Sequence, residues 1–564
     1  MGSDDGARLV YADELIERGD PYGEFIATAC AYERCDDAAL RTELAARVDA
    51  LYEAHGERWL AELGLVRGEA VWKRGFVDRL DLLATRLVQL GDLRKLPVRR
   101  VRLRELAGDR VAVARAVAAP LLARVTELDL QDNGLDAECM RALAEEPQLA
   151  RLTALELRRN PLGPDGLRAL AEATHLTELR TLGLSSCEYL PELQPGDDGA
   201  RALANAHHLT QLVELDLRHG DIGEAGICAL SSAPQLAGLQ ILRVAGCWMG
   251  QVGAQSIAGH LTELVELDAC GTGVGVRGAR SLTDRLERIE ELGLCCNDLT
   301  AAGVRALVGG PRLGALRQLW LGSNQLGSAG ARVLAGARKM TALEVLGLSS
   351  NEIGHAGVRA LVGAPHLAGL TMLDLAWNPI GWRGAQAIAS STLPALASLD
   401  LQRTGLGIRG ARVLATATLP SLVALDVAGN ELGDEGVRVL APLIRQLTRL
   451  ELPSNDLGPA AARALRDASQ LATLDVAYNR LGVEGAQILA NTNFPALREL
   501  RIQVNQLGTE GAVALASAPW LPTLEILRIA PSDEIGHAGL AALRAAAPAL
   551  RIIGFGSVSD AGAA

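Results

Sequence analysis

Aromatic side chains are scarce in this sequence, in which Phe, Trp and Tyr make up only 3% of 564 residues. Hydrophobic residues nevertheless make up 49% of the chain. A core with so few large rings must be built from Leu, Val and Ala, which suits a stack of thin, similar layers. The scarcity therefore favours a repeat protein over the several separate domains that the length alone would suggest.

The cysteines, the hydrophobic runs and the charge exclude further classes. Nine cysteines occur without a CxxC pair, the first residues lack a secretory hydrophobic segment, and no apolar run of about 18 residues is present. We therefore expect a reduced, cytoplasmic protein without a membrane span. The net charge of −12 argues against a general phosphate-binding surface, so we expect no nucleic-acid partner.

A repeat begins near Val98 and follows the pattern LxxLxLxxN. Clear copies are residues 316–324 (LRQLWLGSN), 343–351 (LEVLGLSSN), 370–378 (LTMLDLAWN) and 497–505 (LRELRIQVN). The second Leu of the pattern marks 18 units, mostly 24 to 27 residues apart: Val101, Leu128, Leu155, Leu182, Leu215, Leu242, Leu267, Leu292, Leu319, Leu346, Leu373, Leu399, Leu425, Leu450, Leu474, Leu500, Leu527 and Ile553.

Each part of the repeat has a structural role. The LxL pair alternates with period two, which places both Leu on the buried face of a short strand and the residue between them outside. The Asn that follows is expected to bond backbone groups at the turn and to stack into a ladder, with Cys187 and Cys247 as small substitutes. Apolar residues at helical spacing, as in residues 329–335, predict a helix on the opposite side.

The full unit LxxLxLxxNxLGxxGxxxLA, as in residues 343–361, resembles the ribonuclease-inhibitor type of leucine-rich repeat. The resemblance implies an α/β horseshoe solenoid with a parallel sheet on the concave face, helices on the convex face and a protein-binding role. We assign residues 71–564 to this solenoid of about 18 repeats, including a C-terminal cap.

Residues 1–70 lack the repeat. Residues 8–26 (RLVYADELIERGDPYGEFI), with 54–60 (AHGERWL) and 73–77 (KRGFV), resemble the small helical repeat-companion module that precedes leucine-rich repeats in some bacteria, myxobacteria and planctomycetes especially. The sequence predicts one helix over residues 7–18, a break at Gly19-Asp20-Pro21, and a second helix from about Tyr22. This module is either a hydrophobic cap over the first repeat or a recognition module in its own right.

The solvent-facing positions of the predicted strands suggest a partner-binding surface. Five consecutive acids occupy the fifth position of adjacent repeats, and strands about 4.8 Å apart would make them a self-repelling stripe that a basic partner relieves. Asp is also common at this position, so a purely structural role is the alternative. The rare exposed aromatics either contact a partner or pack on their neighbours. The predicted partner-binding residues are Trp320, Met372, Asp374, Trp377, Asp400, Asp426, Glu451, Asp475 and Tyr478.

Three further features allow more than one interpretation. An insertion at residues 188–198 (EYLPELQPGDD) predicts a protruding loop, which is a gate, a protease site or a tolerated length variant. Cys247, Cys270, Cys295 and Cys296 fall on three successive repeats, and their cluster is either a metal or redox site or a set of small packing residues. The basic residues from Arg94 to Arg104 fit a strand with one solvated face better than a nucleic-acid site.

No HExxH, GxSxG or Walker motif occurs, so we expect a protein that is not an enzyme and has no cofactor or metal. The favoured function is a non-enzymatic scaffold, inhibitor or regulator, monomeric on its own, that holds a partner protein with a basic surface on its concave face. One alternative is a regulatory substrate that a protease cuts to release a partner. The other is a GTPase-activator-like accessory protein, because one relative of this repeat class activates GTPases.

Overall fold

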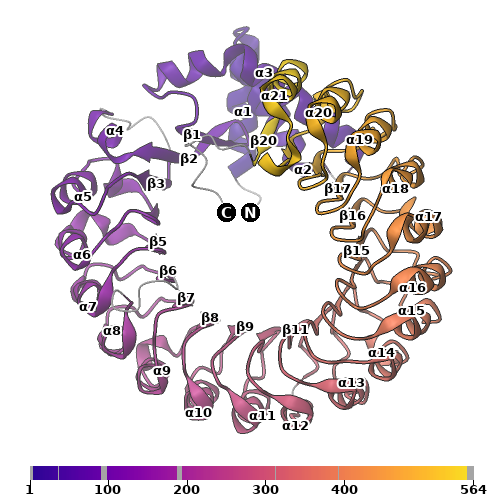
Figure 1. The fold of residues 1–564 in the computed structure, drawn as a ribbon. Coiled ribbons are helices and arrows are strands. Elements are labelled where there is room, and N and C mark those ends of the chain that lie inside the picture. The colour runs from indigo at the N-terminus through magenta and orange to yellow at the C-terminus, as the bar shows by residue number, and fades with distance from the viewer. Residues whose placement is uncertain are drawn as a thin grey trace. The chain divides into compact units, whose positions relative to one another are not determined.

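The computed structural model describes residues 4–35, 37–90, 98–186, 194–311, 313–391 and 393–554. The chain divides into two compact units, Met1–Leu264 and Val265–Ala564. In each unit short strands alternate with helices, and Figure 1 shows the strands on one side and the helices on the other. The predicted architecture, a leucine-rich-repeat solenoid with a parallel sheet and a layer of helices, is confirmed in both units.

Unit 1 begins with three helices and a hairpin, namely α1 (Asp4–Glu17), α2 (Pro21–Arg34), α3 (Ala38–Glu62), β1 (Ala70–Lys73) and β2 (Phe76–Leu83). The predicted break between the first two helices is confirmed. Pro21 is the first residue of α2, where its missing N–H costs nothing, and the Asp20 carboxylate accepts a hydrogen bond of 3.0 Å from the Tyr22 amide.

Aromatic rings are concentrated in this first part of unit 1. Eight of the 17 aromatic residues lie within residues 1–83, so this part has a core of a different kind from the leucine layers. The ring centroid of Phe25 lies 4.9 Å from that of Trp59 and 5.6 Å from that of Trp72, which joins the hairpin to the helices. Strand β2 then pairs in parallel with the first repeat strand, Leu80 opposite Val101. The N-terminal helices are thus linked to the repeats through one continuous sheet.

In the part of unit 1 that the structure describes, the repeats supply these strands and α-helices: β3 (Arg100–Arg104), β4 (Glu127–Asp129), β5 (Ala154–Glu156), β6 (Thr181–Gly183), β7 (Glu214–Asp216), β8 (Ile241–Arg243), α4 (Ala84–Gln89), α5 (Arg110–Val117), α6 (Ala137–Ala144), α7 (Gly163–Glu172), α8 (Gly196–Ala204), α9 (Glu224–Ser231) and α10 (Gly250–His260). These strands pair in parallel in chain order.

The described residues of unit 2 form twelve parallel strands: β9 (Glu266–Asp268), β10 (Glu291–Gly293), β11 (Gln318–Trp320), β12 (Val345–Gly347), β13 (Met372–Asp374), β14 (Ser398–Asp400), β15 (Ala424–Asp426), β16 (Arg449–Glu451), β17 (Thr473–Asp475), β18 (Glu499–Arg501), β19 (Ile526–Arg528) and β20 (Arg551–Ile553). Its helices are α11 (Gly275–Arg285), α12 (Thr300–Val308), α13 (Gly327–Ala335), α14 (His355–Val362), α15 (Gly381–Ala389), α16 (Gly407–Leu414), α17 (Gly433–Ile444), α18 (Pro459–Ala464), α19 (Gly482–Ala490), α20 (Gly508–Ala516) and α21 (Gly536–Ala546).

The marker leucines lie opposite one another in the paired strands. Leu319 pairs with Leu346, which pairs with Leu373, and all three are buried. The marker predicted for the last strand is wrong by one residue, because Leu527 pairs with Ile552 and not with Ile553. Two adjacent isoleucines follow Arg551, so the alternation that fixes register elsewhere is missing there.

The asparagine ladder is confirmed by its hydrogen bonds. The Asn351 amide group donates to the carbonyl oxygens of Leu321 at 2.7 Å and Leu348 at 3.0 Å. Its Oδ1 accepts from the Asn324 amide at 2.9 Å and from the Leu326 amide at 3.3 Å, which ties one repeat to the preceding one. Cys247 takes the same place and bonds the Leu217 carbonyl at 3.3 Å, as predicted, whereas Cys187 lies outside the described residues.

The predicted insertion is corrected at its C-terminal end. Residues 188–193 lie outside the described part of the chain, but Gly196, Asp197 and Asp198 form the first turn of α8, where we expected no helix. Acidic residues suit the positive N-terminal end of a helix, and one of them is also anchored there. The Asp197 carboxylate accepts from the Gly223 amide at 2.7 Å and from the Gly226 amide at 2.9 Å.

Candidate partner-binding face

The exposed side of the unit 2 sheet, called here the strand face, carries the five predicted acids in one row. Asp374 lies opposite Asp400, Asp400 opposite Asp426, Asp426 opposite Glu451, and Glu451 opposite Asp475. This carboxylate stripe runs across β13–β17 and ends where Arg501 lies opposite Asp475. The structure therefore brings together five of the nine predicted site residues, in the register that the repeat predicts.

Four members of the carboxylate stripe also have a structural role. An oxygen of Asp374, Asp400, Asp426 and Asp475 accepts a hydrogen bond of 2.8–2.9 Å from the backbone amide two residues further on. Asp129 makes the same bond in unit 1, at 3.0 Å to the Gln131 amide. Aspartate at this position thus ends the strand, which explains why it recurs outside the stripe as well.

The electrostatic environment of the stripe disfavours ionisation. Partial burial, together with the neighbouring charges of Asp374 and Glu451, raises the pKa of Asp400 to about 6. Burial also raises the pKa of Asp426, and the carboxylates of Asp400 and Glu451 on either side add to the effect. Burial raises the pKa of Asp374 and of Asp475 as well, although Arg501 opposes the shift at Asp475.

Cations touch only part of the stripe. Among the described residues, Asp374, Asp400 and Asp426 have no ion-pair partner, whereas the Arg449 Nε lies 2.7 Å from Glu451 Oε1 and the Arg501 Nη1 lies 3.7 Å from Asp475 Oδ2. Three neighbouring carboxylates are therefore left without compensation, half-buried and side by side. A positive group placed over them would favour their charged forms.

Trp320, predicted to be exposed on this face, is half-buried instead. Its ring lies over Gly347 on the neighbouring strand, so closely that a Cβ atom at Gly347 would come within 2.3 Å of Trp320 Cε3. The sequence left two roles open for the exposed aromatics, contact with a partner or packing on a neighbour. The contact with Gly347 supports packing for Trp320. Gly347 is thus the residue that makes room for Trp320, a pairing 27 positions apart that the sequence does not reveal on its own.

Replacing Gly347 with alanine is expected to displace the Trp320 ring and to lower the free energy of unfolding by about 1–2 kcal/mol, because the site is already filled. Urea unfolding and acrylamide quenching of tryptophan fluorescence measure the two effects. Gly336→Ala is the matched control, because a Cβ atom there meets nothing closer than 3.4 Å. Equal stability and equal quenching in the two variants would show that the ring is not seated on Gly347.

Trp377 is the aromatic residue of this face that is available to a partner. Its side chain is 48% exposed, its Nε1 donates a 2.9 Å hydrogen bond to Gln402 Oε1, and the Arg403 guanidinium lies 4.2 Å from the ring centroid. The ring is therefore held in a fixed orientation while half of it faces solvent. Met372 lies on the same repeat at the start of β13 and is half-buried.

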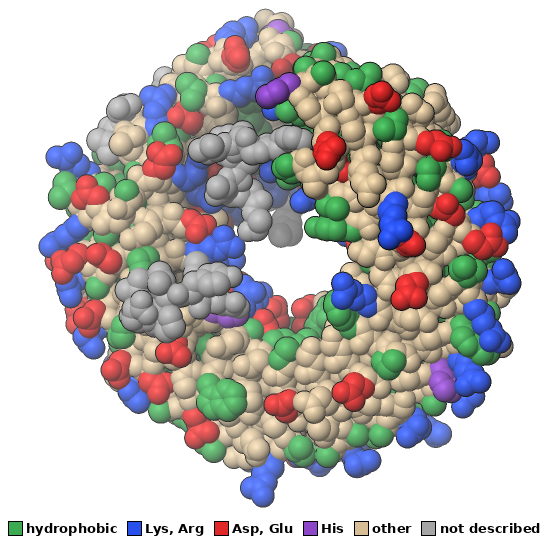
Figure 2. Space-filling model, viewed as in Figure 1, with side chains coloured by type: hydrophobic (Ala, Val, Ile, Leu, Met, Phe, Trp, Pro, Cys, Tyr) green, Lys and Arg blue, Asp and Glu red, His purple; other side chains and the backbone are tan. Residues whose placement is uncertain are grey.

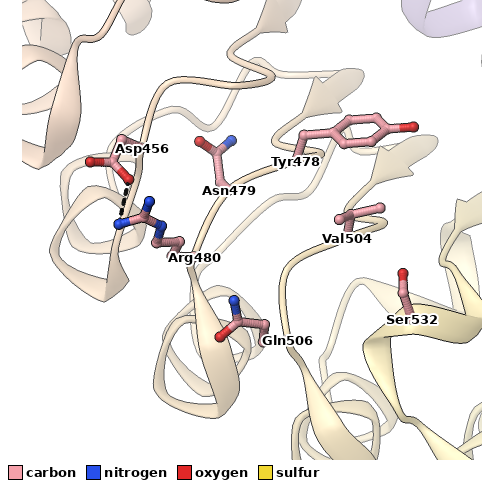
Figure 3. A pocket seen from close by; sticks show the side chains of 7 residues that line it. All are labelled: Asp456, Tyr478, Asn479, Arg480, Val504, Gln506 and Ser532. Carbon is pink, nitrogen blue, oxygen red and sulfur yellow. Dashed lines mark ion pairs between the residues drawn. The ribbon is translucent and has the colours of Figure 1, made fainter.

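Tyr478 lies four repeats after Trp377, at a hollow formed by the turns that leave the strands (Figure 3). Its side chain is 59% exposed, and the hollow measures about 380 Å³. An ion pair of 3.0 Å between Arg480 Nη1 and Asp456 Oδ1 lines one side. Val504, Gln506 and Ser532, which the sequence did not single out, line the other, because repeats 24 to 28 residues apart meet there.

The most exposed tryptophan is not among the residues predicted from the sequence. Trp248 of unit 1 is 70% exposed and directly follows Cys247 of the ladder. Our interpretation considered only the strand positions before the ladder residue, whereas Trp248 is the first residue after it. A search of the turn positions for aromatic residues would have found it.

The cysteine cluster resolves into one close pair. Cys270 and Cys295 lie side by side in unit 2, where the Cys295 amide donates to Cys270 Sγ at 3.2 Å. A hydrogen bond between the two thiols raises the pKa of Cys270 and lowers that of Cys295. Cys247 is buried in unit 1, where burial raises its pKa to about 11, and Cys296 is exposed. Within the described residues no group of three or more metal ligands occurs.

The basic strand near the start of the repeats is neutralised by its neighbours. Arg100 lies 2.9 Å from Glu127, Arg102 lies 3.7 Å from Asp129, and Arg104 lies 2.6 Å from Asp81. Arg94 and Lys95 lie outside the described residues. Acidic and basic side chains therefore face one another across β2, β3 and β4, and their ion pairs stabilise a solvated strand surface.

The match to a family model agrees with the fold. A family model described as Leucine Rich repeat matches residues 151–171, 339–362, 370–389, 418–441 and 495–516, so the chain carries leucine-rich repeats. Fold and repeats together define the class, a leucine-rich-repeat solenoid. Among solved structures the chain is similar to the "Crystal structure of TLR13-ssRNA13 complex", with 16% identity and a TM-score of 0.38. This similarity covers 81% of the present chain and only 60% of that chain. Curated proteins give no match.

The helices that the structure describes include none that is both long and apolar enough to cross a membrane.

Proposed function

We propose that this protein is a non-enzymatic scaffold, acting as an inhibitor or regulator, that holds the basic surface of a partner protein on the strand face of unit 2. The observation that carries the proposal is the run of three unpaired, half-buried carboxylates at Asp374, Asp400 and Asp426. Charges in such a position interact more strongly with an incoming cation than fully exposed charges do. A Lys or Arg of the partner is the group that compensates them.

The surroundings of the stripe support a protein partner over a free cation. Trp377 lies on the same repeat as Asp374, is half exposed and is oriented by Gln402 and Arg403. Tryptophan and arginine are the residues most enriched among the contacts that dominate protein interfaces. A rigid, half-exposed ring beside unpaired charge offers both the apolar and the electrostatic part of such a contact.

We also propose a domain division, a repeat subtype, a location and an oligomeric state for this protein. Residues 1–70 form a bacterial repeat-companion module that caps the first repeat, and residues 71–564 form a solenoid of the ribonuclease-inhibitor type in a cytoplasmic, monomeric protein. The aromatic core that joins α2, α3 and β1 supports a module with its own packing. The alternatives are a substrate that a protease cuts to release its partner and a GTPase-activator-like accessory protein. Limited proteolysis and a turnover assay with GTPases distinguish them.

The test is affinity capture with the double variant Asp400→Asn/Asp426→Asn, followed by binding measurements on the captured protein after purification. Asparagine keeps the oxygen that accepts the backbone amide and removes only the charge. We expect binding to weaken about tenfold, because two compensated charges are lost. Asp129→Asn in unit 1 is the matched control, since it has the same strand position and backbone bond. A partner that binds all three proteins equally would rule out the carboxylate stripe as its site.

A further inference from the structure

In several repeats an exposed arginine of the outer helix forms an ion pair with an acid of the same helix. Helices α6, α7, α8 and α17 each carry an exposed arginine preceded by an acid three residues earlier, and the two side chains form an ion pair. These pairs are Glu138–Arg141, Asp165–Arg168, Asp198–Arg201 and Glu435–Arg438. The acid–arginine pair is thus a recurrent element of the outer helix in this chain.

Five successive helices of unit 2, α12–α16, lack this pair. None of them contains Asp or Glu. The position of the acid is occupied by Ala302, Ala329 and Ala356 in the first three helices and by Arg383 and Arg409 in the next two. The exposed arginines of these helices that have no ion-pair partner among the described residues form what we call the arginine row: Arg305, Arg332, Arg359, Arg383 and Arg409. Arg412 of α16 is not part of the row, because it lies 3.6 Å from Glu435 of α17.

The arginine row is exposed and uncompensated. All five side chains are exposed, and among the described residues none of them has an ion-pair partner. Figure 2 shows Lys and Arg side chains projecting from the rim where α13–α16 lie. Consecutive helices pack side by side, roughly 8–10 Å apart, so the guanidinium groups follow one another along the helix layer. In a chain with a net charge of −12, this is a local surface of the opposite sign.

An apolar centre accompanies the row. The Arg409 guanidinium lies 3.3 Å and the Arg383 guanidinium 5.3 Å from the centroid of the Trp382 ring. Ile408 takes the place of Trp382 in the next repeat and is 41% exposed. Beside them, a groove of about 590 Å³ between α14 and α15 is lined by His355, Arg359, Arg383, Gln386 and Ser390.

We propose that the helix face over α12–α16 binds an acidic, leucine-containing segment of a second protein. The planar guanidinium groups suit carboxylates, which they bind through two parallel hydrogen bonds. The half-buried Trp382 and the exposed Ile408 supply an apolar contact, which distinguishes a protein segment from a phosphate backbone. The negative net charge of the chain also opposes a long nucleic acid. This site is separate from the strand face and carries charge of the opposite sign.

The test uses fluorescent peptides and restores the missing acids. The probes are a 20-residue polyglutamate and a glutamate peptide of the same length with leucine at every fourth position. The triple variant Ala302→Glu/Ala329→Glu/Ala356→Glu rebuilds the ion pair found in α6 and α17, and the same triple change to Gln is its uncharged control. We expect the Glu variant to bind the leucine-containing peptide about tenfold more weakly than the Gln control does.

A second variant tests the apolar contact. Trp382→Ala is expected to abolish the preference for the leucine-containing peptide over polyglutamate. If circular dichroism shows that the triple variant does not fold, the single variant Ala329→Glu replaces it in the test. We expect Ala329→Glu to weaken peptide binding about twofold to threefold. Equal binding by the Glu and Gln variants would overturn the proposal. So would tighter binding of a single-stranded oligonucleotide of equal charge, or of phosphatidylserine vesicles, because the row would then recognise phosphate. Asp400→Asn/Asp426→Asn is expected to leave peptide binding unchanged, which separates this result from the strand-face proposal.

Discussion

Replacing Asn351 with alanine is expected to lower the free energy of unfolding by about 3 kcal/mol, a large effect for one polar side chain. Asn351 is fully buried, and it donates to Leu321 and Leu348 and accepts from the Asn324 and Leu326 amides. Alanine leaves buried backbone groups of two repeats without a partner, and such groups are costly away from water. Urea unfolding followed by circular dichroism measures the loss.

Natural substitutions within the ladder provide the control. Thr404 takes the asparagine position one repeat after Asn378, and its Oγ1 donates to the Leu401 carbonyl at 2.7 Å. Asn351→Thr keeps one donor and one acceptor, so we expect it to cost only about 1–2 kcal/mol. Ser350→Ala alters the exposed neighbour and is expected to have almost no effect. If Asn351→Ala were no worse than Asn351→Thr, the ladder bonds would not be what stabilises the turn.

The repeated part of the fold follows from the sequence because its contacts recur at the same positions. The LxL leucines and the ladder asparagine meet the same residue types in each neighbour, so one unit predicts the next. The prediction failed where the neighbour differs. At Ile553 no alternation sets the register, and at Trp320 the decisive residue is Gly347 on another strand.

The candidate binding site was likewise predictable only in part. The carboxylate stripe follows from register alone, and the structure aligns it as expected. The unpaired state of Asp374, Asp400 and Asp426 does not follow from register, because it depends on where the neighbouring arginine side chains point. The absence of acids beside the arginine row was visible in the sequence, but it is the ion pairs of α6, α7, α8 and α17 that show what those acids do.

The double variant Asp400→Asn/Asp426→Asn is expected to be more stable than the natural protein at pH 8, by about 2 kcal/mol, and equally stable at pH 4. A carboxyl whose pKa is higher in the folded than in the unfolded protein stabilises the fold while it is protonated. That stabilisation is complete below the unfolded pKa, near 4, and is lost as the pH rises through the folded value, which is about 6 for Asp400. The raised pKa of Asp426 extends the loss further upward. Asparagine imitates the protonated acid at every pH, so the variant escapes the loss.

Urea unfolding at pH 4, 6 and 8 measures this difference, and a gain that does not change with pH would show that the two carboxylates are not destabilised by their charge. Asp129→Asn is the control, and we expect no gain at pH 8 because Arg102 lies 3.7 Å from that carboxylate.

The raised pKa values of the stripe also make partner binding depend on pH. A basic partner that covers the stripe must lower the raised pKa values, so binding near pH 6 releases protons. Calorimetry in two buffers of different ionisation enthalpy detects that release, and the double variant should abolish it. If the double variant keeps its extra stability at pH 8 but releases as many protons on binding as the natural protein does, the partner must bind away from Asp400 and Asp426.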